Sequence, residues 1–206
     1  MTQSILGNIS AEDFLSNYWQ KKPLLIRGAI PNFEAPIDGD ELAGLALEPE
    51  VESRLVVSDK WTLEHGPFDE NRFSPLPPSH WTLLVQAVDL WVPEVGALMK
   101  HFDFLPPWRI DDIMVSYAED GGSVGPHFDY YDVFLLQGVG QRRWEIGAVC
   151  DAESPLLKDA GLKVLAEFEA LEEWILEPGD MLYLPPMVAH HGVAMGACTA
   201  FSVGFR

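Results

Sequence analysis

The sequence predicts an α+β fold that is mainly β, in which helices come first and an antiparallel barrel or jelly roll follows. Before residue 109, apolar residues recur at helical spacing between prolines. After it, short β-rich runs alternate with proline, glycine and acidic residues. Helices followed by many short strands are typical of α+β proteins. At 206 residues with 48% hydrophobic content, the chain is long enough for one well-cored domain.

Residues 1–108 are expected to form helices and short strands that pack on the barrel. Ser10 precedes two acidic residues and an apolar repeat, which is typical of a helix N-cap, and Pro23 ends that helix. The other expected elements are a strand at 23–28, a helix at 38–47, a strand at 54–58, an irregular loop at 64–78, and helices at 81–91 and 94–101.

Residues 109–206 are expected to form the barrel as one structural unit. Its expected strands are 109–118, 130–137, 142–146, 173–176, 181–184 and 198–205. A turn at 138–140 is expected to join two of these strands as a hairpin. Residues 151–172 are acidic and are expected to be partly helical.

The charge balance restricts the partners of the chain. Thirteen basic residues oppose 32 acidic ones, a net charge of −19. Phosphate backbones would repel such a protein, so we expect no direct nucleic-acid binding, and its field would favour a cationic partner. No apolar run is long enough to span a bilayer, and residues 1–10 do not resemble a signal peptide. With only two cysteines, the expected location is the cytoplasm.

Histidine and aspartate residues predict a metal site. His127 and Asp129 stand two residues apart, so in extended chain their side chains point to the same side. His190 and His191 follow a later Pro-Gly-Asp turn. Two histidines and one carboxylate are the facial triad that binds non-haem Fe(II). Periodicity does not choose between His190 and His191, and a hydrogen-bonded pair of His127 and Asp129 is the alternative.

Arg142 is the second notable residue of this region. It follows His127 by 15 residues, on the strand that returns from the expected hairpin. A buried arginine is costly unless it meets an anion, and its guanidinium suits a carboxylate. The alternative is a surface arginine paired with one of the many acidic side chains.

Several blocks of sequence together resemble one family. They are residues 18–27, 109–112, 122–129, 131–138, 142–144 and the last five residues, together with the Pro-Gly-Asp, Pro-Pro and His segment at 178–190. In this order they resemble the JmjC branch of the 2-oxoglutarate- and Fe(II)-dependent oxygenases. More narrowly, they resemble the bacterial ribosomal oxygenases of the YcfD/RoxA type. The resemblance runs nearly from end to end.

The resemblance implies a double-stranded β-helix of the cupin or JmjC type. It implies that His127, Asp129 and His190 hold Fe(II). It also implies that 2-oxoglutarate and dioxygen are used, with Arg142 binding the far carboxylate of 2-oxoglutarate and Ser116 a second candidate for that contact.

Two positions depart from the family pattern. His191 stands where relatives carry an acidic residue, and it becomes a candidate for a group beside the ligands or for a competing ligand. Met187 stands where the cupin pattern has glycine, which is expected to alter the loop without supplying a ligand.

By resemblance, the chain would hydroxylate an arginine side chain of a large-subunit ribosomal protein. Such a basic partner suits an acidic enzyme, and Asp120, Tyr131 and Asp132 are candidates for contact with the guanidinium. One alternative is a JmjC oxygenase or demethylase that acts on another residue. Another is a cupin metal protein that acts on a small molecule without 2-oxoglutarate. The family's dimerisation and winged-helix regions are expected to be absent, because the sequence ends at Arg206.

Overall fold

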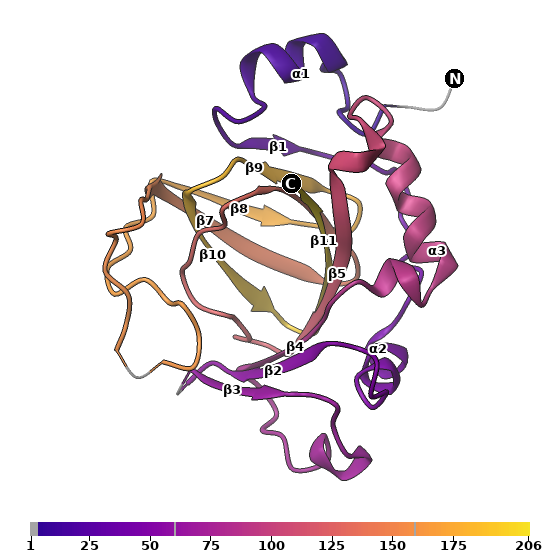
Figure 1. Ribbon diagram of the computed structural model, residues 1–206, viewed down its shortest axis with the longest axis vertical. Helices are drawn as coiled ribbons and strands as arrows, with labels where there is room; N and C mark the ends of the chain where they lie inside the picture. Colours follow the sequence, from indigo (N-terminus) through magenta and orange to yellow (C-terminus); the bar gives the residue numbers. More distant parts are fainter. Residues whose placement is uncertain (1–3, 60, 159) are drawn as a thin grey trace.

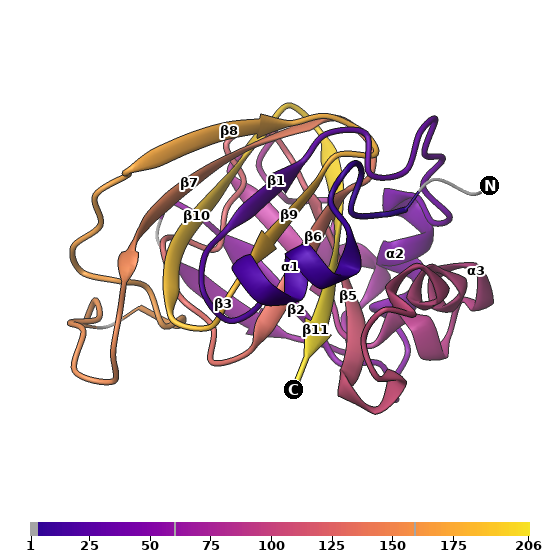
Figure 2. The same cartoon turned by 90° about the horizontal axis from the view of Figure 1, so that it is seen from above.

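The computed structural model describes residues 4–59, 61–158 and 160–206. Within these residues, the strands form an eight-stranded sheet in the order β1-β9-β6-β11-β5-β4-β2-β3 and a three-stranded sheet in the order β10-β7-β8. All pairings are antiparallel. Figures 1 and 2 show the two sheets curving around a common centre, as expected for a double-stranded β-helix.

The element bounds follow the chain. The strands are β1 (Leu24–Ile26), β2 (Ser53–Val57), β3 (Thr62–His65), β4 (Trp81–Val85), β5 (Ile110–Ala118), β6 (Asp132–Gln137), β7 (Gln141–Val149), β8 (Glu172–Leu176), β9 (Met181–Leu184), β10 (Val188–Met195) and β11 (Cys198–Phe205). The helices are α1 (Ala11–Asn17), α2 (Gly39–Leu45) and α3 (Pro93–Gly96), and the 3-10 turns are η1 (Glu70–Arg72), η2 (Val88–Leu90), η3 (Ala97–Phe102) and η4 (Pro107–Arg109).

Strand β6 separates two hydrophobic cores. All six of its residues are buried, so both of its faces are covered. Phe134 faces a core that is shared with Phe14 of α1 and Leu42 of α2. Val133 faces a smaller core that also contains Trp144 from the second sheet. The helices therefore cover the outside of the large sheet, and the space between the sheets is left for a site.

Ser10 caps the first helix as expected, and the second helix has a cap that was not predicted. The Ser10 hydroxyl accepts from the backbone N–H of Asp13 at 3.0 Å. Asp38 and Glu41 form a reciprocal capping box at the start of α2. These contacts satisfy backbone donors that a helix leaves without intrahelical partners.

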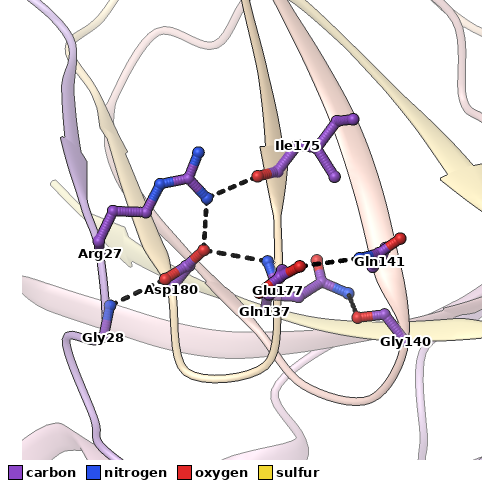
Figure 3. Close-up of polar contacts among 8 residues, drawn as sticks. All are labelled: Arg27, Gly28, Gln137, Gly140, Gln141, Ile175, Glu177 and Asp180. Atoms are coloured by element: carbon purple, nitrogen blue, oxygen red, sulfur yellow. Dashed lines mark hydrogen bonds and ion pairs between the residues drawn. The ribbon is translucent and has the colours of Figure 1, made fainter.

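A polar network fastens the edge strand β1 to the turn before β9 (Figure 3). Asp180 is buried and its carboxylate accepts from the Gly28 N–H at 2.8 Å and the Glu177 N–H at 3.1 Å. Arg27 donates to the same carboxylate at 2.6 Å. Gly179 supplies the left-handed backbone of the turn, with φ +86°.

The expected hairpin is wrong. Strand β6 pairs with β9 and β11 in the large sheet, whereas β7 pairs with β8 and β10 in the small sheet. The loop at 138–140 is held instead by Thr199, whose backbone bonds both Gly138 and Val139. Glycines that predict a tight turn thus carry the chain from one sheet to the other.

The expected helix at 81–91 is also wrong. Residues 81–85 form β4, which is buried between β2 and β5 at four of its five positions. A short apolar run is compatible with either a helix or a buried strand, and here the pairing with β2 and β5 makes it a strand. The partly helical segment expected at 151–172 contains no helix among its described residues. Elsewhere in the chain, the structure contains strands β3 and β10, which were not predicted.

The predicted boundary at residue 108 is not tested by these contacts and stays a prediction. Strands β1 to β4 from the N-terminal part are nevertheless hydrogen-bonded members of the large sheet. In the part of the chain that the structure describes, every helix is too short or too polar to span a bilayer.

Candidate metal centre

Three side chains converge at the mouth of the space between the sheets. One ligand atom from each of His127, Asp129 and His190 lies within 4.8 Å of the other two. His190 Nε2 lies 3.7 Å from Asp129 Oδ2, and the imidazole centroids lie 4.2 Å apart. His190 is buried, and the other two are partly exposed. The arrangement offers two nitrogens and one carboxylate to one ion.

Backbone contacts bring these distant residues together. His127 forms an isolated β-bridge with His190, with N–H to carbonyl distances of 3.0 and 2.8 Å. The Asp129 carbonyl accepts from the N–H of Met187 at 2.7 Å. His127 and Asp129 therefore lie outside the named strands, yet their two-residue spacing still directs both side chains to the same point. Met187 has φ +69°, the left-handed region that favours glycine.

Hydrogen bonds fix both imidazoles in one orientation. His127 Nδ1 lies 2.9 Å from the Gly125 carbonyl, and His190 Nδ1 lies 2.9 Å from the Val188 carbonyl. A carbonyl only accepts, so each Nδ1 carries the proton and each Nε2 keeps a lone pair. Metal-binding histidines are typically held in this way.

Electrostatics keep His190 neutral. Burial and, to a smaller extent, the neighbouring His127 lower the pKa of His190 from 6.5 to about 4, while Asp129 acts in the opposite sense. A neutral imidazole is the form that binds a metal ion.

The structure separates His190 from His191. His191 lies on the opposite face of β10, where its Nδ1 contacts Glu145 Oε2 at 2.8 Å and its ring packs against Phe168. It is absent from the group of described side chains that could share an ion.

Arg142 lies in the same interior as the triad. Its residue is 7% exposed, and no carboxylate lies within 4.0 Å of its guanidinium among the described residues. Its partners are the Ser116 hydroxyl at 3.1 Å and the Cys198 sulfur at 3.4 Å, and its Nε has no partner within the described chain. A buried cation without an anion is costly, so this position calls for an anionic ligand.

One cavity of about 320 Å³ contains the triad, Arg142 and Ser116. Apolar walls come from Val133, Leu135 and Trp144. The volume lies at the lower end of the range of small-molecule sites. The cavity can therefore hold a small anion between Arg142 and the triad.

The predicted substrate residues are divided by the structure. Tyr131 lines the cavity, and burial raises its pKa to about 12. Asp120 and Asp132 do not line it. Asp120 is exposed and accepts from the Gly196 N–H. Asp132 is buried and accepts from the hydroxyl of Tyr183 and the amide of Gln20.

The cavity wall contains three further polar residues that were not predicted as site residues, Arg54, Gln86 and Asp112. They come from β2, from the residue after β4, and from β5. Only the order of strands in the large sheet brings them together, so no local spacing in the sequence could have indicated them.

Comparison with protein families decides the classification. Residues 97–206 match the model of the JmjC domain. The chain belongs to the JmjC domain family. This JmjC chain is 47% identical over 196 residues to the ribosomal protein uL16 3-hydroxylase of Escherichia coli, covering 94% of the chain and 52% of that relative. It is 43% identical to the probable ribosomal oxygenase of Haemophilus influenzae, covering 97% of the chain and 50% of the relative.

A solved structure shares the fold. It is YcfD, a ribosomal oxygenase from Escherichia coli, in complex with cobalt and 2-oxoglutarate. The TM-score is 0.87 at 46% identity, covering 97% of this JmjC chain and 52% of the solved one. The chain thus spans about half the length of the relatives it matches.

Proposed function

We propose that this chain is a 2-oxoglutarate- and Fe(II)-dependent protein hydroxylase that acts on an arginine side chain of a large-subunit ribosomal protein. The observation that carries the proposal is Arg142, a buried guanidinium without a carboxylate partner, in the same cavity as the His-Asp-His triad. The relatives named for ribosomal hydroxylation support the substrate class.

The donor set fits Fe(II). His127 and His190 present Nε2 lone pairs, and Asp129 supplies a carboxylate. Two histidines and one carboxylate leave coordination positions open for a cosubstrate and dioxygen. With these bound, the iron would supply oxidation of an unactivated C–H bond, coupled to conversion of 2-oxoglutarate into succinate and carbon dioxide.

The chain's own residues orient the reactants and exclude water. Arg142 would hold the far carboxylate of 2-oxoglutarate in a charge-assisted contact, with Ser116 alongside. Val133, Leu135 and Trp144 provide an apolar wall that limits water near the reacting carbon. A cupin that works without 2-oxoglutarate would leave the cost of burying Arg142 without compensation.

Asp112 is the residue we assign to the substrate guanidinium. Apart from Asp129, it is the one carboxylate among the described residues that line the cavity. Burial raises its pKa, and hydrogen bonds from Gln86 and Ala87 counteract that effect. Together with the ring of Tyr131, it offers a cationic side chain an anion and an aromatic face.

The net charge of −19 supports a basic protein partner. A ribosomal partner also favours action in the cytoplasm. The arginine contact, the partner and this location are parts of the same proposal.

The test is hydroxylation of a defined substrate. Wild-type protein with Fe(II), 2-oxoglutarate and air is incubated with ribosomal proteins or arginine peptides, and mass spectrometry follows the substrate while succinate is measured. We expect a gain of one oxygen on an arginine that matches the succinate formed, and no gain without 2-oxoglutarate. Oxygen on a lysine instead, or substrate turnover that needs no 2-oxoglutarate, would contradict the proposal.

A further inference from the structure

Arg54 places a positive charge in the wall of this cavity. It lines the wall of a cavity proposed to accept a cationic side chain. Its guanidinium has no carboxylate within 4.0 Å among the residues that the structure describes. A cation at this position would repel the cationic substrate unless it interacts with another group of the protein.

The side-chain amide of Gln86 connects Arg54 to Asp112. Arg54 Nη2 donates to Gln86 Oε1 at 2.9 Å, and Gln86 Nε2 donates to Asp112 Oδ2 at 2.6 Å. Arg54 Nη2 also contacts the sulfur of Met114 at 3.7 Å, which limits its movement. The three side chains come from three neighbouring strand regions of the large sheet.

A side-chain amide suits this link. Arginine can only donate and an ionised aspartate can only accept, so the residue between them must accept on one side and donate on the other. The glutamine amide does both, and Arg54 fixes which end of the amide faces Asp112. If the amide were reversed, its carbonyl oxygen would face an ionised carboxylate.

The link also determines which oxygen of Asp112 is free. Oδ2 accepts from Gln86 and from the Ala87 N–H at 2.9 Å. Oδ1 lies beside Gly204 and Tyr131, since a Cβ built at Gly204 would be 3.7 Å from both Oδ1 and the tyrosine ring. Both Gly204 and Tyr131 line the cavity, so Oδ1 is the oxygen that the cavity presents.

We infer that Gln86 and Arg54 are positioning residues that hold Asp112 as an ionised carboxylate with Oδ1 directed at the substrate. The inference rests on the proposed function, because it assigns the substrate's cation to Asp112. Two donors on Oδ2 stabilise the charged form of a partly buried carboxyl group. The chain therefore gives this part of the cavity a preference for a cationic side chain, although Arg54, Arg142 and Lys163 also line the cavity.

The other charged groups around Asp112 are already accounted for. Asp111 beside it on β5 pairs with Arg206 at 2.8 Å, and Asp89 of η2 accepts from the Ile113 N–H at 2.8 Å. Both carboxylates raise the pKa of Asp112, as burial does. Tyr131, in the segment before β6, lies beside Gly204 as Asp112 does. Against these groups, the two donors on Oδ2 act to lower the pKa of Asp112 and so favour ionisation.

The kinetic test compares Gln86→Met with Gln141→Met. Methionine keeps the length of glutamine but loses both hydrogen bonds, and Gln141 is a matched control whose amide donates to the exposed Glu177 at 3.0 Å. For an arginine peptide we expect Gln86→Met to raise KM about tenfold, the loss typical of one hydrogen bond to a charged group. kcat at saturating peptide should change less than about twofold, because iron and 2-oxoglutarate are bound elsewhere.

A second readout does not depend on turnover. The carboxyl carbon of Asp112 is followed by NMR during a pH titration of the zinc-loaded protein, with Asp112→Asn for assignment. We expect the pKa of Asp112 to rise in both Gln86→Met and Arg54→Met. Arg54→Lys keeps a donor, so the pKa should rise less than in Arg54→Met. Gln141→Met should titrate as wild type.

The two readouts separate the two proposals. If wild type adds no oxygen to any arginine while the Asp112 pKa shifts as expected, the proposed function fails and the positioning role stands. If arginine is hydroxylated with the same KM in wild type and Gln86→Met, or if the pKa does not move, the positioning role is overturned.

Discussion

At the scale of single residues, two adjacent histidines have different contacts and point to opposite faces of one strand. His190 turns its Nε2 toward Asp129, whereas His191 contacts Glu145 on the other face of β10. The alternation of side chains along a strand separates them, although the sequence alone left the choice open. The proposed role of Arg142 also depends on its position, because a buried guanidinium needs an anion, whereas an exposed one does not.

The adjacent histidines provide a matched pair of variants. We expect His190→Ala to weaken Mn(II) or Co(II) binding by at least about a hundredfold, since one of three protein ligands is lost. His191→Ala should change the affinity by less than about tenfold, because His191 lies outside the group of described side chains that could share an ion and contacts Glu145 instead. Isothermal titration of both variants checks this, and equal losses in the two would contradict the assignment of His190.

Arg142→Met is expected to separate stability from cosubstrate binding. Removing a buried cation that lacks an anion should raise the free energy of unfolding of the metal-free protein by about 1–3 kcal/mol. Ser116 keeps a contact with the Ala200 carbonyl at 3.4 Å, so no buried hydroxyl is left without a partner. The variant should also lose binding of 2-oxoglutarate.

Thermal unfolding with and without 2-oxoglutarate and Mn(II) checks both effects of Arg142→Met. Wild type should gain thermal stability from added 2-oxoglutarate, and the variant should not. A variant that is less stable than wild type, yet still gains stability from 2-oxoglutarate, would show that another group binds the anion.

At the scale of elements, the sequence predicted local features better than pairings. The capped start of α1, the position of α2 and most strands of the barrel follow from residues that are adjacent in the chain. The HxD spacing likewise predicted a shared direction for His127 and Asp129. The supposed hairpin failed because β6 and β7 belong to different sheets. Asp112 was missed for a similar reason, since its partners Gln86 and Ala87 follow a different strand, β4.

The network at the start of β9 should contribute stability without taking part in the site (Figure 3). Asp180→Ala leaves two backbone N–H groups, of Gly28 and Glu177, without their acceptor. We expect a loss of about 2–3 kcal/mol in the free energy of unfolding. Arg27→Met should cost less than about 1 kcal/mol, because the Arg27 side chain is 55% exposed and solvent screens its ion pair.

Urea unfolding of the two variants gives these values. Mn(II) affinity should remain within about twofold of wild type in both, because neither residue lies among the candidate ligands. An equal cost for both substitutions would mean that the ion pair, and not the acceptor for the backbone, carries the stabilisation.

At the scale of the whole molecule, charge and cavity chemistry act over different distances. A net charge of −19 acts across the surface and is screened by salt within about 10 Å at 0.1 M ionic strength. Asp112 acts inside a partly buried cavity, where screening is weaker. The surface field should therefore affect how fast a basic partner arrives, while the cavity decides which side chain is accepted.

This separation predicts how salt affects turnover. Between about 50 and 300 mM NaCl, we expect kcat/KM for an arginine peptide with several flanking lysines to fall about three- to tenfold, because screening weakens long-range attraction. A peptide with the same arginine between neutral residues should lose less than about twofold, since only the contact inside the cavity remains. KM for 2-oxoglutarate, measured at saturating peptide, corrects for any effect of salt on the cosubstrate. If both peptides lost activity in parallel, the acidic surface would have no part in recruiting the substrate, and selection would reside in the cavity alone.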